Sequence, residues 1–220
     1  FDDLDPLAQE NNIELIMLKA GQAIPGDAKL VLIPGSKSTR GDLNFLREQG
    51  WDIDLYAHYR RGGHILGLCG GYQMLGKQID DPDGLDGPAG RTEGLGLLDV
   101  KTEMLPEKTL RKITAIHRDS SLVVEGYEIH LGRTTGEDCK QPFAYLDKEP
   151  EGACSTDGRI SGSYLHGLFC SDGFRSAFLE NLGVSGGDLK YEKNLDDVLN
   201  ELAKHIEDQL DVDALLEVAK

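Results

Sequence analysis

The amino-acid sequence predicts an α/β fold: a central, mostly parallel sheet with antiparallel additions and with helices on both faces. Two observations predict it. In the first half of the 220 residues, short apolar runs alternate with segments of helical composition, the pattern of a parallel sheet with covered faces. From Gly94 onward, strand-like segments follow one another without helices between them, which indicates antiparallel strands joined to the parallel core.

The elements of the first half follow from apolar runs that end at glycine, proline or serine. The clearest is the run at residues 64–68, which leads directly into Cys69 and a glycine pair. Strands are predicted at residues 13–18, 29–33 and 64–68, and helices at residues 42–49, 52–61 and 70–78. A loop rich in Gly, Pro and Asp is expected at residues 80–90.

The second half is predicted to consist of strands followed by two helices. Strands are predicted at residues 95–100, 110–116, 122–130 and 159–165, and helices at residues 172–181 and 195–210. The last helix has apolar residues at helical spacing beneath an acidic face. The glycine-rich residues 185–187 are expected to form a hinge before the C-terminal helices.

Charge and cysteine content exclude several classes of partner. Asp plus Glu number 39 against 23 for Lys plus Arg, and the resulting net charge of −16 argues against nucleic acid and anionic membranes. No apolar run is long enough to span a bilayer. The four cysteines lack the close spacing of zinc or disulfide motifs, so a reducing cytoplasm is the expected location. The first residues, which lack Met, look like part of a longer chain.

Cys69 lies where a strand is expected to turn into a helix, with Gly67, Gly70 and Gly71 around it. A thiol at such a turn is exposed at the edge of the sheet, and the amino end of the helix favours the thiolate. The glycines allow a sharp turn and the approach of a substrate. The pattern therefore predicts a nucleophile elbow. The alternative is a small buried hydrophobic side chain, the commoner state of a lone cysteine.

A thiolate nucleophile needs a base, and His166 is the best candidate because it ends a predicted strand and precedes Gly167. His130, in front of the loop-like residues 131–133, stays open as an alternative.

The other four histidines are expected to have structural or exposed positions. His58 and His205 are placed on the surfaces of helices, and His117 in a strand. His64 begins the strand that ends at Cys69, so it should lie at the end of that strand away from the thiol.

An oxyanion hole needs backbone N–H groups, and two glycine turns can supply them. One is Gly70, directly after the cysteine; the other is the Gly35-Ser36 turn after the second strand. Both turns fall at the carboxyl edge of a parallel sheet, where ligands bind. Residues 34–39 superficially resemble a phosphate loop, but they lack its first glycine and its Gly-Lys-Ser/Thr ending, so nucleotide binding is not expected there.

These motifs together resemble the class I (triad-type) glutamine amidotransferases, and most of all the amidotransferase domain of the cobyric acid synthase family in cobalamin biosynthesis. The resemblance covers nearly the whole chain and is carried by residues 1–7, 32–39, 67–76, 93–98, 126–134 and 162–169. It implies a flavodoxin-like class I amidotransferase fold.

The resemblance also implies roles for particular residues. Cys69 would attack the side-chain amide of glutamine, and His166 would act first as base and then as the acid that releases ammonia. The N–H groups of Ser36 and Gly70 would hold the oxyanion. The resemblance further implies that Gln73 and Arg133 contact glutamine, Arg133 as a clamp for its α-carboxylate, and that no metal is bound. A structural ion pair is the alternative for Arg133.

One position departs from the family pattern. Many class I amidotransferases have a glutamate two residues after the catalytic histidine, which orients the imidazole, whereas this chain has Leu168. The resemblance therefore implies a Cys-His pair, or a third member from elsewhere in the chain, for which Glu128 is a candidate.

The resemblance also implies a missing half. Residues 1–8 would be the end of a linker from an N-terminal ATP-binding synthetase domain, and residues 9–220 would be the glutaminase domain with its C-terminal helices. ATP and magnesium are expected only on that synthetase domain, which would amidate the carboxylates of a corrin precursor, adenosylcobyrinic acid a,c-diamide. The domain described here would need no cofactor of its own. Two alternatives are a degenerate domain retained for docking or regulation and the glutaminase subunit of a peptidoglycan-amidating complex.

Overall fold

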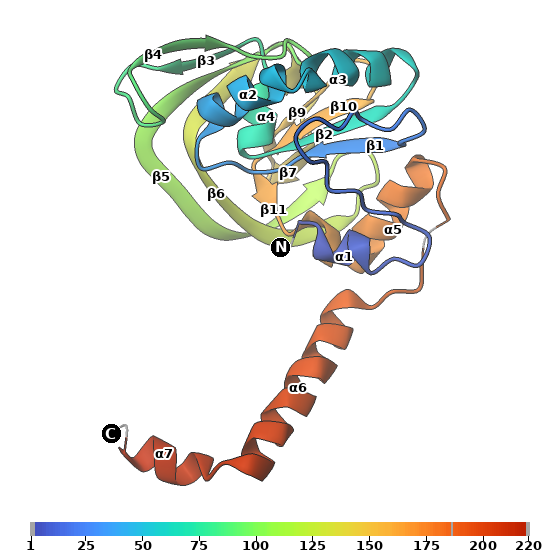
Figure 1. The fold of residues 1–220 in the computed structure, drawn as a ribbon, viewed down its shortest axis with the longest axis vertical. Helices are drawn as coiled ribbons and strands as arrows, with labels where there is room; N and C mark the ends of the chain where they lie inside the picture. The colour runs from blue at the N-terminus through green and yellow to red at the C-terminus, as the bar shows by residue number, and fades with distance from the viewer. Residues whose placement is uncertain (1–2, 186, 219–220) are drawn as a thin grey trace. The chain divides into compact units, whose positions relative to one another are not determined.

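The computed structural model describes residues 3–185 and 187–218 and divides into two units, residues 1–187 and residues 188–220 (Figure 1). The first unit holds two sheets and most of the helices. None of the described helices is long and apolar enough to cross a membrane.

The parallel core predicted from the sequence is confirmed as a four-stranded sheet in the order β1-β2-β10-β9. Strands β1 (Leu30–Ile33), β2 (His64–Leu68) and β10 (Ile160–Ser163) are parallel, and β9 (Ala153–Cys154) is antiparallel to β10. Because Gly67 is in register with Ile33 and with Gly162, the three parallel strands end at one edge, next to Cys69.

Helices cover both faces of this sheet, as predicted (Figure 1). On one face, Ile65 packs in a core with α2 (Thr39–Glu48), α3 (Trp51–Arg60) and α4 (Gly70–Leu75). On the other face, Leu66 and Leu68 pack with α1 (Asp5–Ala8) and α5 (Asp172–Asn181). The alternation along β2 reflects the two-residue period of a strand that is buried on both sides.

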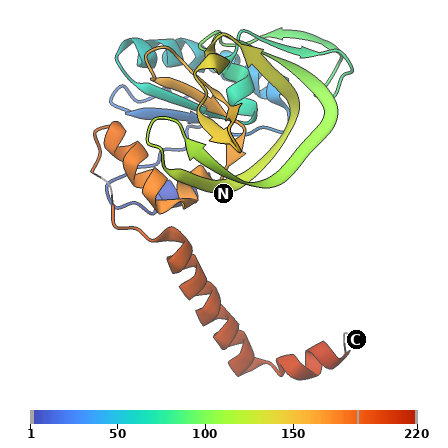
Figure 2. The same ribbon diagram turned by 180° about the vertical axis from the view of Figure 1, so that it is seen from behind.

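The antiparallel additions form a second sheet, in the order β11-β6-β5-β3-β4, instead of extending the first one. Its two long strands, β5 (Val100–His117) and β6 (Val123–Gly136), pair antiparallel and bend around the rest of the unit (Figure 2). The shorter strands are β3 (Gln78–Asp81), β4 (Gly90–Glu93), β7 (Ala144–Leu146), β8 (Glu149–Glu151) and β11 (Leu165–His166). Short 3-10 helices follow β6 and β11, η1 (Asp138–Lys140) and η2 (Leu168–Cys170).

Two predicted strands are wrong. Residues 13–18 form no strand, because this apolar run pairs with no strand of either sheet. Its side chains Leu15, Ile16 and Met17 are exposed. Residues 95–99 are also not a strand. Their backbone caps the C-terminus of α4: the N–H groups of Leu95 and Leu97 donate to carbonyls of that helix at 2.8 and 2.9 Å. As a result α4 ends at Leu75 and β5 begins only at Val100.

The C-terminal unit contains α6 (Tyr191–Gln209) and α7 (Val212–Val218). Helix α6 includes most of the segment predicted as helical, and the apolar side chains of its stripe are exposed, among them Val198, Leu199 and Leu202. The predicted hinge at residues 185–187 includes residue 186, which lies outside the described residues.

Candidate active site

Cys69 occupies a strained turn between β2 and α4. Its φ of 51° and ψ of −108° are unusual for a residue with a side chain, and strain of this kind is concentrated at functional sites. The turn depends on the close approach of glycine backbone, since a Cβ on Gly71 would lie 2.0 Å from the carbonyl oxygen of Ile33. The thiol is partly exposed, and its Sγ donates to the carbonyl of Ile129 at 3.3 Å. The predicted elbow geometry is therefore present.

His166 comes from the second sheet and reaches the same place. A Cβ added to Gly35 would lie 3.6 Å from Cβ of Cys69 and 3.1 Å from Cε1 of His166, so both side chains border one point. The imidazole stacks on Tyr127 with ring centroids 5.2 Å apart and planes 11° from parallel, which fixes its plane. The structure thus brings together the two residues that the sequence analysis paired.

A third residue, missed by the sequence analysis, completes this arrangement. Oδ2 of Asp3 lies 2.7 Å from Nδ1 of His166, and its Oδ1 accepts the Gly167 N–H at 2.8 Å. The carboxylate therefore holds the imidazole from the side opposite Nε2, as the acid of a triad does. Leu168, at the family's glutamate position, is fully buried in the core.

Glu128, the candidate for the third member, does not contact His166, so that prediction is wrong. Its carboxylate bonds Nε2 of His130 at 3.0 Å and Nε of Arg111 at 2.6 Å, so it belongs to a different cluster. The Asp3 contact joins residues 163 positions apart, which local sequence patterns do not reveal.

The environment of His166 favours its protonated form. Burial lowers the pKa of the imidazole, but hydrogen bonding to the Asp3 carboxylate and the nearby Cys69 sulfur outweigh burial and raise the pKa to about 9. Among the residues that the structure describes, Nε2 is buried without a well-aligned hydrogen-bond partner. At neutral pH the ring is therefore an imidazolium beside the Cys69 sulfur.

The two backbone donors predicted for an oxyanion hole lie next to each other. The position of a Cβ on Gly70 is only 2.9 Å from the backbone N of Ser36. The Gly70 N–H is the first of α4 and so has no acceptor within the helix. The Ser36 turn is held by its own side chain, whose hydroxyl donates to Asp42 at 2.5 Å and accepts the Ser38 N–H at 2.9 Å.

Gln73 lies in α4, one turn after Cys69, and is almost completely buried. Its Nε2 donates to the carbonyl of Leu131 at 2.9 Å and to the Tyr164 hydroxyl at 3.2 Å, and its Oε1 accepts the Thr39 hydroxyl at 3.2 Å. Both polar ends thus have protein partners here, and a contact with glutamine stays a prediction.

Arg133 lies on β6 and is exposed on the wall of a cavity of about 710 Å³. His130 lines the same cavity, with its ring stacked on Tyr164 at 3.8 Å between centroids. Arg111 and Glu128 also line it, so the walls of the cavity hold charges of both signs. The role of Arg133 as a carboxylate clamp stays a prediction.

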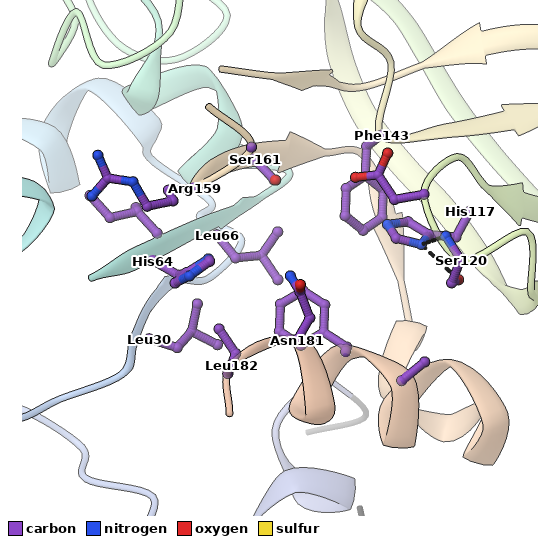
Figure 3. A pocket seen from close by; sticks show the side chains of 15 residues that line it. Leu30, His64, Leu66, His117, Ser120, Phe143, Arg159, Ser161, Asn181 and Leu182 are labelled. Carbon is purple, nitrogen blue, oxygen red and sulfur yellow. Dashed lines mark hydrogen bonds between the residues drawn. The ribbon is translucent and has the colours of Figure 1, made fainter. Parts of the chain in front are cut away.

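A second cavity, of about 240 Å³, lies at the opposite edge of the parallel sheet (Figure 3). It is lined by Leu30 and His64, which begin β1 and β2, and by His117, whose Nδ1 pairs with the Ser120 hydroxyl at 2.8 Å. His64 is thus far from Cys69, as expected.

The expected positions of the remaining histidines are partly confirmed. His117 is a packing residue between Phe143 and Phe174. His205 is exposed on α6. The surface position expected for His58 is wrong: it is 1% exposed, and its Nε2 bonds the His64 carbonyl at 2.9 Å, in space left open by Gly63.

Cys69 on a strained elbow, His166 bonded to Asp3 beside it and a mainly parallel core sheet form an arrangement found in α/β enzymes that use a cysteine nucleophile. Residues 1–174 match the family described as the CobB/CobQ-like glutamine amidotransferase domain, and the chain belongs to this family.

Curated relatives agree with this family membership. The chain is 62% identical over 220 residues to a cobyric acid synthase of Bradyrhizobium diazoefficiens and 58% identical to one of Rhodobacter capsulatus. Each alignment covers all of this chain but only 46% of the relative, so the chain spans about half the length of the relatives it matches. A solved structure titled as a glutamine amidotransferase shares the fold, with a TM-score of 0.51 and 21% identity, over 71% of this chain and 80% of its own.

Proposed function

We propose that this domain hydrolyses glutamine through a γ-glutamyl thioester on Cys69 and supplies the ammonia for an ATP-dependent amidation of corrin carboxylates. The observation that supports this most is the convergence of Cys69 and His166 at Gly35, with Asp3 bonded to the far side of the imidazole at 2.7 Å.

The first half of the reaction releases ammonia. The Cys69 thiolate attacks the side-chain carbonyl carbon of glutamine, and the N–H groups of Ser36 and Gly70 receive the oxyanion. The carbon–nitrogen bond breaks as Nε2 of His166 gives its proton to the leaving nitrogen. Ammonia departs, and the acyl group stays on sulfur.

The second half regenerates the enzyme. The neutral His166 takes a proton from water, whose oxygen attacks the thioester, and the carbon–sulfur bond breaks to restore the thiolate and release glutamate. Nδ1 donates to Asp3 throughout, which keeps Nε2 directed at the reacting atoms.

The names and lengths of the relatives support a proposal for the partner and the final substrate. Because the chain spans 46% of proteins named cobyric acid synthase, we propose that the remainder of such an enzyme is an ATP- and magnesium-dependent synthetase that amidates adenosylcobyrinic acid a,c-diamide. The domain described here would then need glutamine and that synthetase, and no cofactor of its own.

Covalent labelling with the glutamine analogue diazo-oxonorleucine tests the proposal. We expect one equivalent of label on Cys69, none in Cys69→Ser, and full labelling in the matched control Cys170→Ser. The alternative is a degenerate domain retained only for docking, which the replacement of the family's glutamate by Leu168 would favour. Such a domain would take up no label. Labelling of another cysteine would also overturn the proposal.

A further inference from the structure

Glu151 is a buried carboxylate for which the proposed reaction has no use. It ends β8, is 8% exposed, and neither of its oxygens bonds a Lys, Arg or His side chain among the described residues. Its partners are the Tyr164 N–H, at 2.6 Å from Oε1, and the Ser163 hydroxyl, at 2.9 Å from Oε2. Burying a carboxylate that has only two neutral hydrogen-bond donors costs desolvation free energy, so a functional role for Glu151 is worth seeking.

The two partners lie where the chain changes sheets. Ser163 ends β10 in the parallel sheet, and Leu165 begins β11 in the second sheet. His166 follows immediately, paired with Tyr127 of β6. Glu151 therefore hydrogen-bonds to both residues of the junction, Ser163 and Tyr164, which connects the parallel sheet to the strand that contains His166.

Ser163 links the same junction to the thiol. Its carbonyl accepts the Cys69 N–H at 2.8 Å, and its Oγ accepts the Leu165 N–H at 3.0 Å while donating to Glu151. One residue thus holds the backbone of Cys69 on one side and the strand of His166 on the other, and Glu151 fixes the side chain that connects them.

We propose that Glu151 is a positioning residue that sets the separation of Cys69 and His166 by anchoring Ser163 and Tyr164. This inference rests on the proposed function of the pair. The ionised form of Glu151 accepts from both partners at once, whereas a protonated carboxyl or a glutamine amide at this position would direct a hydrogen at the Ser163 hydroxyl and force that hydroxyl to turn.

The surroundings of Glu151 make this acceptor form sensitive to pH. Burial raises the pKa of Glu151 to about 7, even though its hydrogen bonds from Tyr164 and Ser163 lower it. The charge of Glu128 raises it further. Tyr72, Cys139 and Cys154 also interact with Glu151, and all three are neutral near pH 7 because burial raises the pKa of each. The charged or titratable side chains of Arg111, His130 and Arg133 line the same cavity as Glu151.

The test compares Glu151→Gln with Glu149→Gln, an exposed glutamate of the same strand, in the full-length enzyme. We expect Glu151→Gln to slow turnover and the labelling of Cys69 by diazo-oxonorleucine by about 10- to 100-fold, the scale of a misplacement near 1 Å, with KM for glutamine little changed. The wild-type rate should fall as pH drops through about 7, and this limb should be absent in Glu151→Gln. Glu149→Gln should match the wild type in every respect.

Stability separates a positioning role from a purely structural one. Removal of an ionised buried carboxyl should leave the melting temperature at pH 8 equal to or above that of the wild type, so a slow Glu151→Gln enzyme is not an unfolded one. Ser163→Ala, which removes one partner, should also slow labelling. Wild-type rates and wild-type pH profiles in both variants would overturn the inference. Absence of label in the wild type itself would instead overturn the proposed function.

Discussion

Asp3 and His166 form a hydrogen-bonded pair, Oδ2 to Nδ1 at 2.7 Å, although they stand at opposite ends of the first unit's sequence. The pair gives the imidazole an orienting acid in a family member that lacks the glutamate two residues after the histidine. The amino-terminal segment is thus part of the candidate site. The resemblance predicts that residues 1–8 are the end of a linker, yet Leu7 is buried in the core.

Asp3→Asn should lower the glutaminase turnover number, because an amide cannot hold Nδ1 as a donor and stabilise the imidazolium. The loss can reach about 10⁴-fold, the scale on which the orienting carboxylate acts in a Ser-His-Asp triad. Steady-state ammonia release measures it. The matched control is Asp5→Asn, in the first turn of α1, which should retain wild-type activity. Equal rates for the two variants would remove Asp3 from the mechanism.

The raised pKa of His166 gives stability a defined pH dependence. The folded-state pKa is about 9 against 6.5 for an unperturbed histidine, so the folded state binds the proton more tightly. The resulting stabilisation is complete below about pH 6.5 and is lost as pH rises through about 9. Thermal unfolding should therefore show a gap between wild type and Asp3→Asn that is larger at pH 6 than at pH 10. A gap independent of pH would contradict the assignment.

The same titration predicts a loss of activity at high pH. Above about pH 9 the ring has no proton on Nε2 to give to the leaving nitrogen, so turnover should fall there. In Asp3→Asn this limb should move to lower pH, because the main group that raises the pKa is gone. Ammonia release between pH 6 and pH 10.5 measures both profiles.

Gly35→Ala should impair catalysis more than folding. The added methyl would lie 3.1 Å from Cε1 of His166 and 3.6 Å from Cβ of Cys69, close enough to displace the imidazole. We expect a loss of turnover on the order of 10-fold or more, with a small change in unfolding free energy. Gly26→Ala, where no atom lies within 4 Å of the new Cβ, is the control. Gly71→Ala should instead destabilise the fold, because its Cβ would overlap the Ile33 carbonyl.

Arg175 and Glu10 form a buried ion pair at 2.6 Å, between α5 and the segment after α1. Arg175→Met should cost about 3–5 kcal/mol of unfolding free energy, since the Glu10 carboxylate would stay buried without its partner. Denaturant unfolding measures the cost. The double variant Arg175→Met, Glu10→Leu should be less destabilised than Arg175→Met alone, because the deeply buried Glu10 charge is gone and only the partly exposed Asp172 loses its ion pair with Arg175. A purely additive result would contradict the coupling.

The sequence alone predicted the parts of the site that depend on local pattern. The turn at Cys69 brings backbone segments so close together that only glycine fits, and the glycines on both sides of Cys69 in the sequence predict this turn. The single strand predicted at residues 159–165 is wrong in one respect: it is two short strands, β10 and β11, which belong to different sheets, and His166 ends the second of them. Parallel strands ending at one edge then placed Ser36 beside Gly70, as the structure confirms.

Contacts between distant segments were not predictable in this way. Asp3 belongs to no periodic pattern, and one carboxylate in an acidic chain gives no sign of its partner. The hairpin of β7 and β8 has strands of three residues each, too short for alternation to identify, so Glu151 was also missed. The apolar run at residues 13–18 shows the converse error, because apolar composition does not by itself supply a neighbouring strand.

The location of Asp3 has a practical consequence for anyone handling this domain. Asp3 belongs to the amino-terminal segment of the described residues and steadies the imidazole, so a fusion tag, a protease trimming site or a tether placed close to residue 3 acts almost directly on the reacting proton. Measured rates will depend on what is joined or cut near that residue, even when the rest of the molecule is untouched.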